Sequence, residues 1–100
     1  MLLSDSGFPS PKPGNLYVIS RNPHDPIDAR SFRMFPGLLV KYNTFRFLGP
    51  FTFLHLGDII LFVETKRFVG KLLTDELYHV GCGELFGWVS TEGLYLKPAK

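Results

Sequence analysis

The chain has 100 residues, a formal net charge of +2 and a single cysteine. This length is that of one domain, and one cysteine excludes an intrachain disulfide. The modest charge does not favour a dedicated nucleic-acid-binding protein, which usually carries a denser basic surface. The chain holds ten Phe residues but only two Ala residues, Ala29 and Ala99. Such a composition favours sheet over helix, so the sequence predicts an all-β domain.

The first fourteen residues combine Pro and Gly with Ser. Pro9, Pro11 and Pro13 stand at alternate positions, which blocks both a helix and the hydrogen bonding of a strand. We therefore expect an extended arm with polyproline II character at residues 1–14. Two interpretations stay open: a flexible tail, or an arm that docks on a neighbouring subunit through Leu2, Leu3 and Phe8.

Nothing in the sequence indicates a membrane protein or a secreted one. The first residues lack the basic and apolar regions of a signal peptide. No apolar run approaches the ~20 residues that a membrane-spanning helix needs. We expect a soluble protein that is not secreted by a signal peptide, located in the cytoplasm or within a virion-like assembly.

Short apolar runs between Gly and Pro turn signals predict a series of short strands. The stretch 57–64 is central, because a Gly-Asp turn precedes apolar residues that alternate onto both faces. It therefore predicts a strand that is covered on both sides. Residues 27–35 fit one helical turn or an irregular strand. The other expected strands are 16–19, 38–42, 45–47, 77–80, 84–89 and 94–96, with 51–54 leading into the central strand.

From about residue 38 to residue 97 the chain resembles an SH3-like barrel. The resemblance rests on Leu56-Gly57-Asp58-Ile59-Ile60 as the turn into the second strand, on Gly87-Trp88-Val89-Ser90 followed by Leu94-Tyr95-Leu96 as the closing segment, and on Val40-Lys41-Tyr42 as the opening strand. It implies a small barrel at 38–100, an extension at 15–37 that packs on the barrel, and the arm at 1–14.

The resemblance also bears on ligands. SH3 domains that bind proline-rich peptides hold them on exposed aromatic residues. Here the positions of the family's paired Trp fall near Tyr78 and His79, and its Pro before the last turn is Ser90. The loop at 43–56 contains no Asp or Glu. We therefore do not expect the standard polyproline groove, and fold analogy alone assigns no function.

No catalytic or metal motif stands out. Cys82 follows His79 by three residues and is flanked by glycines, which suggests a thiol–imidazole pair, but a small residue at a turn explains it more simply. His24, Asp25 and Asp28 offer metal ligands at a spacing that matches no closed site. Asp75 and Glu76 are expected to be solvated charges. We predict no enzyme activity, no cofactor, no metal and no small-molecule substrate.

The excess of Phe points instead to an interface, since a large exposed apolar patch normally marks one. We predict a non-enzymatic structural or adaptor protein that contacts other protein subunits or copies of itself, for example within a viral or phage-like assembly. The expected contact residues are Phe8, Phe32, Phe35, Phe45, Phe47 and Trp88, although Trp88 fits equally well as packing at the edge of the barrel.

The alternative is a small β-barrel that binds nucleic acid. Basic residues interleaved with aromatic ones suit single-stranded nucleic acid. The modest net charge makes a set of solvated basic side chains around a Phe-rich core the simpler interpretation. The nucleic-acid contacts would be Arg30, Arg33, Arg46, Lys66, Arg67 and Lys71.

Overall fold

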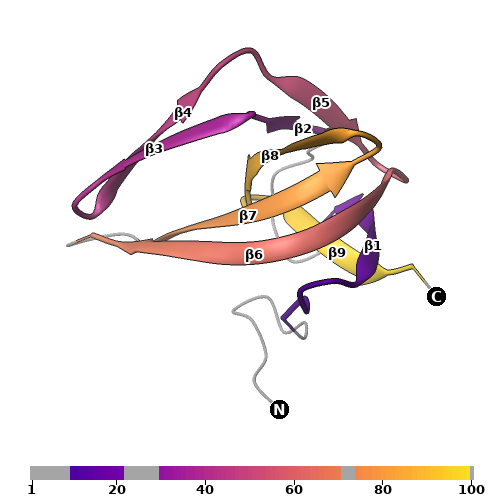
Figure 1. The fold of residues 1–100 in the computed structure, drawn as a ribbon. Coiled ribbons are helices and arrows are strands. Elements are labelled where there is room, and N and C mark those ends of the chain that lie inside the picture. The colour runs from indigo at the N-terminus through magenta and orange to yellow at the C-terminus, as the bar shows by residue number, and fades with distance from the viewer. Residues whose placement is uncertain (1–9, 22–29, 71–73, 100) are drawn as a thin grey trace.

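The described part of the chain contains strands and no helix (Figure 1), which confirms the predicted all-β fold. The computed structural model describes residues 10–21, 30–70 and 74–99. Within them, no helix is available that could cross a membrane. The strands are β1 (Leu16–Arg21), β2 (Ser31–Met34), β3 (Gly37–Lys41), β4 (Thr44–Leu48), β5 (Thr52–His55), β6 (Ile59–Val69), β7 (Thr74–Cys82), β8 (Leu85–Ser90) and β9 (Leu94–Pro98).

Five of these strands form one antiparallel sheet in the order β8-β7-β6-β1-β9. Its longest member is β6, which pairs with β1 at one end and with β7 along most of its length. The register shifts between Phe62 and Glu64, as at a β-bulge, and a bulge increases the local twist. Within the described residues β8 and β9 end this sheet, so its hydrogen bonds do not close it into a barrel.

The pair β2–β5 forms a second layer over this sheet. Along β2 the residues alternate between exposed and buried, which puts Phe32 and Met34 on the inner side. Leu54, paired with Phe32, is the buried residue of β5. These three side chains join Ile19 and Phe62 of the large sheet in one hydrophobic cluster. The main core therefore lies between the two layers, and their outer faces point in opposite directions.

Two backbone hydrogen bonds at Phe35 connect the second layer to β8 at the edge of the first. The N–H of Phe35 donates to the oxygen of Trp88 at 2.9 Å, and the N–H of Trp88 donates back to the oxygen of Phe35 at 2.7 Å. Gly87 makes this approach possible, because a Cβ there would lie 2.5 Å from the oxygen of Phe35 and 2.6 Å from Cγ of Met34. Any larger residue would separate β2 from β8.

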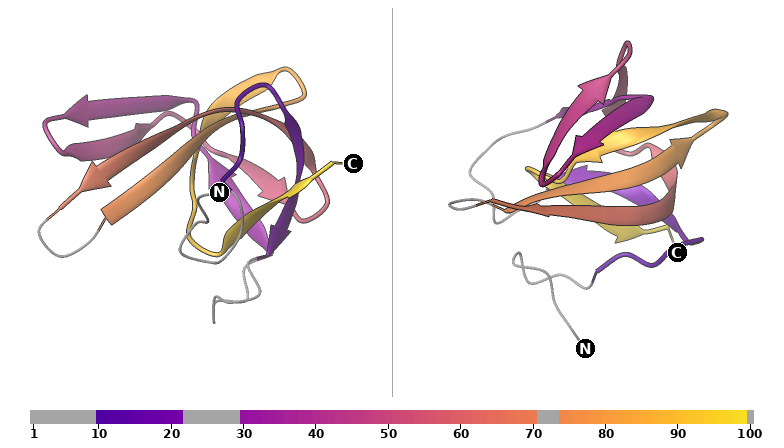
Figure 2. Two further views of the ribbon diagram at one scale, coloured as in Figure 1. Left: turned by 90° about the horizontal axis from the view of Figure 1, so that it is seen from below. Right: turned by 60° about the vertical axis from the view of Figure 1, so that its left-hand side comes forward.

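A second hydrophobic cluster joins the β3–β4 hairpin to the far half of β6–β7. Buried Phe68, Leu77 and Trp88 form its base. The hairpin packs on them with alternate side chains, namely Leu38, Phe45 and Phe47. Figure 2 shows the two hairpins projecting together from one side of the molecule. The opposite face of β6–β7 contributes Tyr78 to the main core, so both faces of this hairpin are used.

The structure departs from the sequence expectations in the opening strand. Residues 38–41 lie in β3 and pair with β4, not with β6. The strand beside β6 is β1, which the sequence analysis had assigned to an extension. The cause is the tight turn at Tyr42, whose φ of 57° lets the chain reverse at once into β4. The uncertain segment 27–35 contains β2, whereas residues 1–9 of the arm lie outside the described residues.

Candidate interaction surface

Four side chains line the outer face of the β2–β5 layer, and we call them the aromatic strip: Arg33, Phe51, Phe53 and His55. Arg33 is paired directly with Phe53 in the register. Phe51, Phe53 and His55 stand at alternate positions along one chain segment, so they share the side that points away from buried Leu54. The strip therefore results from the alternation of side chains between the two faces of a strand.

The strip presents aromatic rings and one cation to solvent. The side chains of Phe51 and Phe53 are 42% and 45% exposed. Their ring centroids lie 5.1 Å apart in an edge-to-face arrangement, and the ring of His55 follows at 6.1 Å from Phe53. Cζ of Arg33 lies 4.9 Å from the centroid of Phe51, within cation–π range. At the other end, Oδ2 of Asp58 accepts a hydrogen bond from the backbone N–H of His55.

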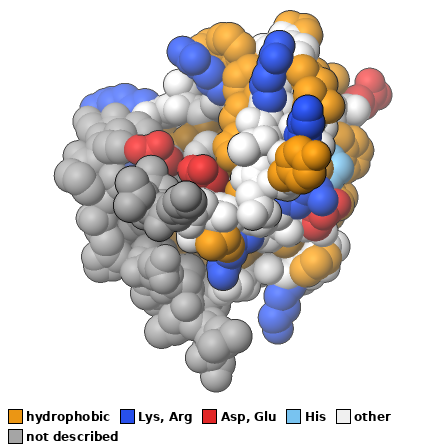
Figure 3. Space-filling view, turned by 90° about the vertical axis from the view of Figure 1, so that its left-hand side faces the viewer, with side chains coloured by type: hydrophobic (Ala, Val, Ile, Leu, Met, Phe, Trp, Pro, Cys, Tyr) orange, Lys and Arg blue, Asp and Glu red, His pale blue; other side chains and the backbone are white. Residues whose placement is uncertain are grey.

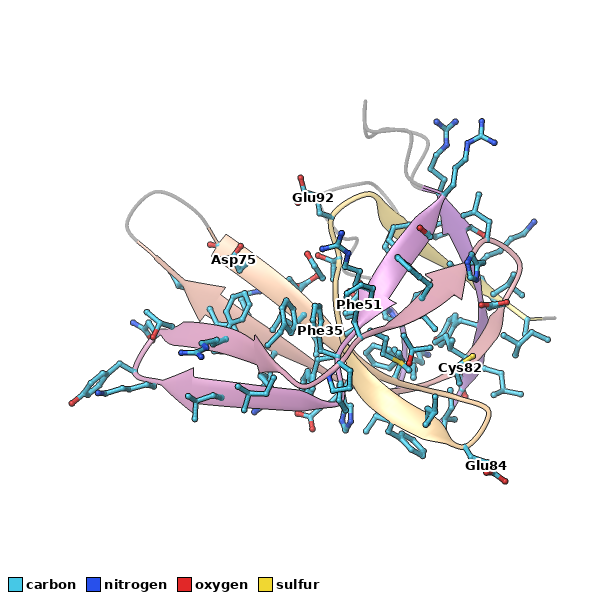
Figure 4. The ribbon with its side chains drawn as sticks, turned by 90° about the horizontal axis from the view of Figure 1, so that it is seen from above. Phe35, Phe51, Asp75, Cys82, Glu84 and Glu92 are labelled. Carbon is cyan, nitrogen blue, oxygen red and sulfur yellow. The ribbon has the colours of Figure 1, made fainter. Side chains whose placement is uncertain are left out.

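The rings beneath the strip hold it in place. Phe35 lies 5.6 Å from Phe51 and stacks on Phe47 at 4.5 Å with an interplanar angle of 13°. Figure 4 shows Phe35 and Phe51 next to each other at the junction of the two layers. Phe47 in turn contacts Phe45, so the exposed rings continue into the second hydrophobic cluster. Such packing limits the rotamers that the exposed rings can adopt.

The predicted contact residues that the structure describes do not belong to the aromatic strip. Phe32 and Trp88 are buried, so neither offers its side chain to a partner in this conformation. Phe35, Phe45 and Phe47 are half-buried and pack on one another. Phe8 lies outside the described residues. On this layer the exposed rings are instead Phe51 and Phe53, and the alternation Phe-Thr-Phe-Leu-His around an inward Leu54 was the sequence signal for them.

The predicted nucleic-acid contacts that the structure describes lie on several different elements. Arg33 joins the aromatic strip, whereas Arg46 lies opposite Leu39 on the outside of the β3–β4 hairpin. Lys66 lies 5.9 Å from the ring of Trp88, and Arg67 is bonded to Glu76 at 2.8 Å. Figure 3, which looks onto the tips of the hairpins, shows basic side chains scattered among apolar ones. Arg30 is exposed just before β2, and Lys71 lies outside the described residues.

The thiol–imidazole pair that the sequence analysis considered less simple than a turn residue is not formed. Both residues belong to β7, and three positions separate them, so His79 and Cys82 point to opposite faces of the sheet. His79 stacks on Trp88 at 4.3 Å, whereas Cys82 packs against the main core. Burial and the nearby charge of Asp58 raise the pKa of the Cys82 thiol. A raised pKa lowers the fraction of the nucleophilic thiolate.

The described residues contain no group of three or more His, Cys, Asp or Glu that could hold a metal ion. His24, Asp25 and Asp28 fall outside the part of the chain that the structure describes. No family model, no curated protein and no solved structure matches this chain. Its surfaces are therefore interpreted from their own chemistry.

Proposed function

We propose that this domain is a non-enzymatic adaptor that binds an exposed segment of another protein on its aromatic strip. The observation that carries the proposal is the pair Phe51 and Phe53, nearly half exposed on a packed strand. Water-exposed rings in a fixed position mark an interaction site. Aromatic and Arg side chains are also the types most enriched among residues that dominate binding energy.

The chemistry of the strip indicates the kind of segment. Two ring faces favour an apolar or aromatic side chain of the partner, and the guanidinium of Arg33 favours a carboxylate beside it. None of the four strip residues is acidic, so a basic segment gains no ion pair there. The partner is therefore a protein segment with an apolar anchor flanked by an acidic residue, for example from another subunit of a virion-like assembly.

An SH3-like arrangement remains part of the proposal, with one change. The consecutive strands β6, β7 and β8 form a meander, and β9 returns to pair with β1. This order supports the resemblance if β1, instead of residues 38–42, is the opening strand. The segment between β1 and β6 then corresponds to the long loop of that family, and the aromatic strip lies within it.

Selection of random peptides on the purified chain tests this function. We expect selected peptides that combine an apolar or aromatic residue with an acidic one. Phe53→Ala should weaken their binding by at least about tenfold, as for a hot-spot residue. The matched control is Leu85→Ala, which removes an equally exposed apolar side chain from the β7–β8 end. The absence of selected peptides, or equal loss in both variants, contradicts the proposal.

A second function has one specific observation in its favour. Aromatic residues at alternate positions of a strand beside an arginine also suit the stacking of successive bases of single-stranded nucleic acid. Titration with a labelled oligothymidylate decides between the binding of a protein segment and the binding of single-stranded nucleic acid. Affinity that falls steeply between about 50 mM and about 200 mM salt, and falls further in Phe53→Ala, favours nucleic acid. No binding at the lower salt concentration excludes it.

A further inference from the structure

The side of β5 that faces away from β2 is an open edge of the second layer. Strand β5 pairs with β2 in a two-stranded sheet, and within the described residues no strand pairs with its other side. In an antiparallel pair, the N–H and C=O of successive residues point alternately toward the partner strand and away from it. Every second residue of β5 therefore directs its backbone groups to the open edge.

The hydrogen bonds of Phe35 show which residues of β5 these are. Phe35 continues β2 and exchanges both backbone hydrogen bonds with Trp88 of β8, so its N–H and C=O point away from β5. Arg33, two positions earlier in the same strand, has the same orientation. Because Arg33 is paired with Phe53, the N–H and C=O of Phe53 point away from β2 and into the open edge.

The end of β5 independently gives the same orientation. The N–H of His55 donates to Oδ2 of Asp58 at 2.9 Å, and the oxygen of His55 accepts from the N–H of Asp58 at 3.1 Å. Asp58 thus closes the edge at His55. By the same alternation the open part presents the backbone groups of Phe51 and Phe53, and outside the β2–β5 pair no described backbone group bonds to them.

We infer that the protein segment binds by adding an extended strand to the open edge of β5, with its side chains along the aromatic strip. This inference rests on the proposed function and gives the conformation of the bound segment. Strand addition is a recurring mode of peptide recognition, in which main-chain hydrogen bonds supply affinity and alternate side chains supply specificity. The rings of Phe51 and Phe53 stand on the same residues whose backbone groups are open, so one segment meets both.

A strand geometry sets the spacing of the side chains in the partner. Residues opposite each other on neighbouring strands share a face, so partner residues opposite Phe51 and Phe53 lie against the strip. The guanidinium of Arg33 lies over the ring of Phe51. An acidic residue therefore belongs opposite Phe51, and an apolar or aromatic one belongs two positions away, opposite Phe53. In polyproline II, which has three residues per turn, the two would have to be three positions apart.

Charge favours an acidic partner segment over a second copy of β5. Residues 30–57 contain Arg30, Arg33, Lys41 and Arg46 but no Asp or Glu. Two copies paired along β5 would bring together two strips that each carry Arg33 and no acidic residue. Like charges disfavour that pairing, whereas a segment with a carboxylate opposite Phe51 gains an attraction.

Two peptides of identical composition test the inference on the full, isotope-labelled chain. They are Thr-Thr-Glu-Thr-Phe-Thr and Thr-Glu-Thr-Thr-Phe-Thr, both with blocked ends. Only the first has Glu and Phe on one face of a strand, so it should bind at least about fivefold more tightly. At saturation it should slow hydrogen exchange of the Phe53 amide by at least about tenfold, because that N–H gains a hydrogen bond. The Leu54 amide, which already points to β2, is the internal control and should slow less.

Several results would overturn the inference. Equal or tighter binding of the second peptide would indicate polyproline II, and unchanged exchange at Phe53 in the bound state would indicate contacts through side chains alone. Failure of both peptides to bind would also contradict it. Exchange at Phe53 that slows with protein concentration in the absence of peptide would assign the edge to a second copy. Selected random peptides whose binding is lost in Phe53→Ala would still support the proposed function in each case, whereas the absence of any selected peptide removes both.

Discussion

Substitution of Gly87 by Ala tests the joint between the two layers. The new Cβ would lie 2.5 Å from the oxygen of Phe35 and 2.6 Å from Cγ of Met34. The first contact is to backbone and cannot be relieved by a rotamer change. The strand β2 must therefore move away from β8, which breaks the two hydrogen bonds between Phe35 and Trp88.

The expected cost has two parts. Overpacking a core position destabilises a protein by about 1–3 kcal/mol. Each of the two backbone hydrogen bonds contributes about 0.5–1.5 kcal/mol. The free energy of unfolding should therefore fall by about 2–6 kcal/mol, which for a domain of this size lowers Tm by roughly 10–50 °C. Thermal unfolding followed by circular dichroism measures this change.

Gly81→Ala supplies the control. A Cβ there would meet only the ring of Phe86, at 2.6 Å, and that half-exposed ring can rotate away into solvent. Both glycines are buried strand residues on neighbouring strands, where Gly87 of β8 is paired with Val80 and Gly81 of β7 with Phe86. We expect a loss below about 1 kcal/mol for Gly81→Ala. A Gly87→Ala variant as stable as the parent, or less damaging than Gly81→Ala, would refute the argument.

Three further predictions concern single side chains. Burial and, after it, the charge of Glu76 raise the pKa of Tyr78 from 10.0 to about 12, partly opposed by Arg67. Tyr78 therefore ionises first in the unfolded chain, so the free energy of unfolding should fall by about 2–3 kcal/mol as the pH rises from 10 to about 12. Urea titrations measure this fall, and Tyr78→Phe should remove it. Tyr42 is 88% exposed, and its backbone has a φ of 57°. Because Asn tolerates this conformation better than Tyr, Tyr42→Asn should raise the free energy of unfolding by about 0.5–1 kcal/mol. An unchanged or lower free energy of unfolding would contradict strain at this turn. Phe68→Ala should lower the free energy of unfolding, measured by chemical denaturation, by about 3–5 kcal/mol, because it leaves a cavity in the second hydrophobic cluster. A loss below about 1 kcal/mol would mean that the β3–β4 hairpin does not pack there.

The fold class and most strand positions were predictable because both follow from local pattern. Apolar alternation around Gly and Pro identified 16–19, 38–42, 77–80, 84–89 and 94–96, and each overlaps a strand. The extent of β6 was not predictable. Its second half carries Glu64 to Arg67, which resembles a polar turn in sequence but forms a paired strand beside β7.

Strand pairing and exposure could not be predicted from pattern alone. Which strand lies beside β6 depends on the tight turn at Tyr42, and Tyr is not a residue that usually signals a positive φ. The central strand was expected to be covered on both faces. The inner residues Ile60 and Phe62 are buried, whereas Ile59 on the other face is exposed. Sequence shows that a face is apolar, but not whether the same chain covers it.

The sequence did not indicate which of the many aromatic rings would be exposed. Phe51, Phe53 and Phe86 are exposed in the structure. Phe32 and Trp88 are buried, because both point into clusters that form only when distant strands meet. Among the basic candidates within the described residues, Arg33 alone joins the strip, since its neighbours in space are fixed by the register of β2 with β5.

The proposal that the aromatic strip binds a protein segment can be tested with amide chemical shifts of the isotope-labelled chain, followed during titration with a selected peptide. The largest shift changes should fall at Arg33 and at residues 51–55, with little change at Leu16, Val18 or Ile59. Shift changes concentrated at Leu16, Val18 and Ile59, with residues 51–55 unmoved, would contradict the proposal.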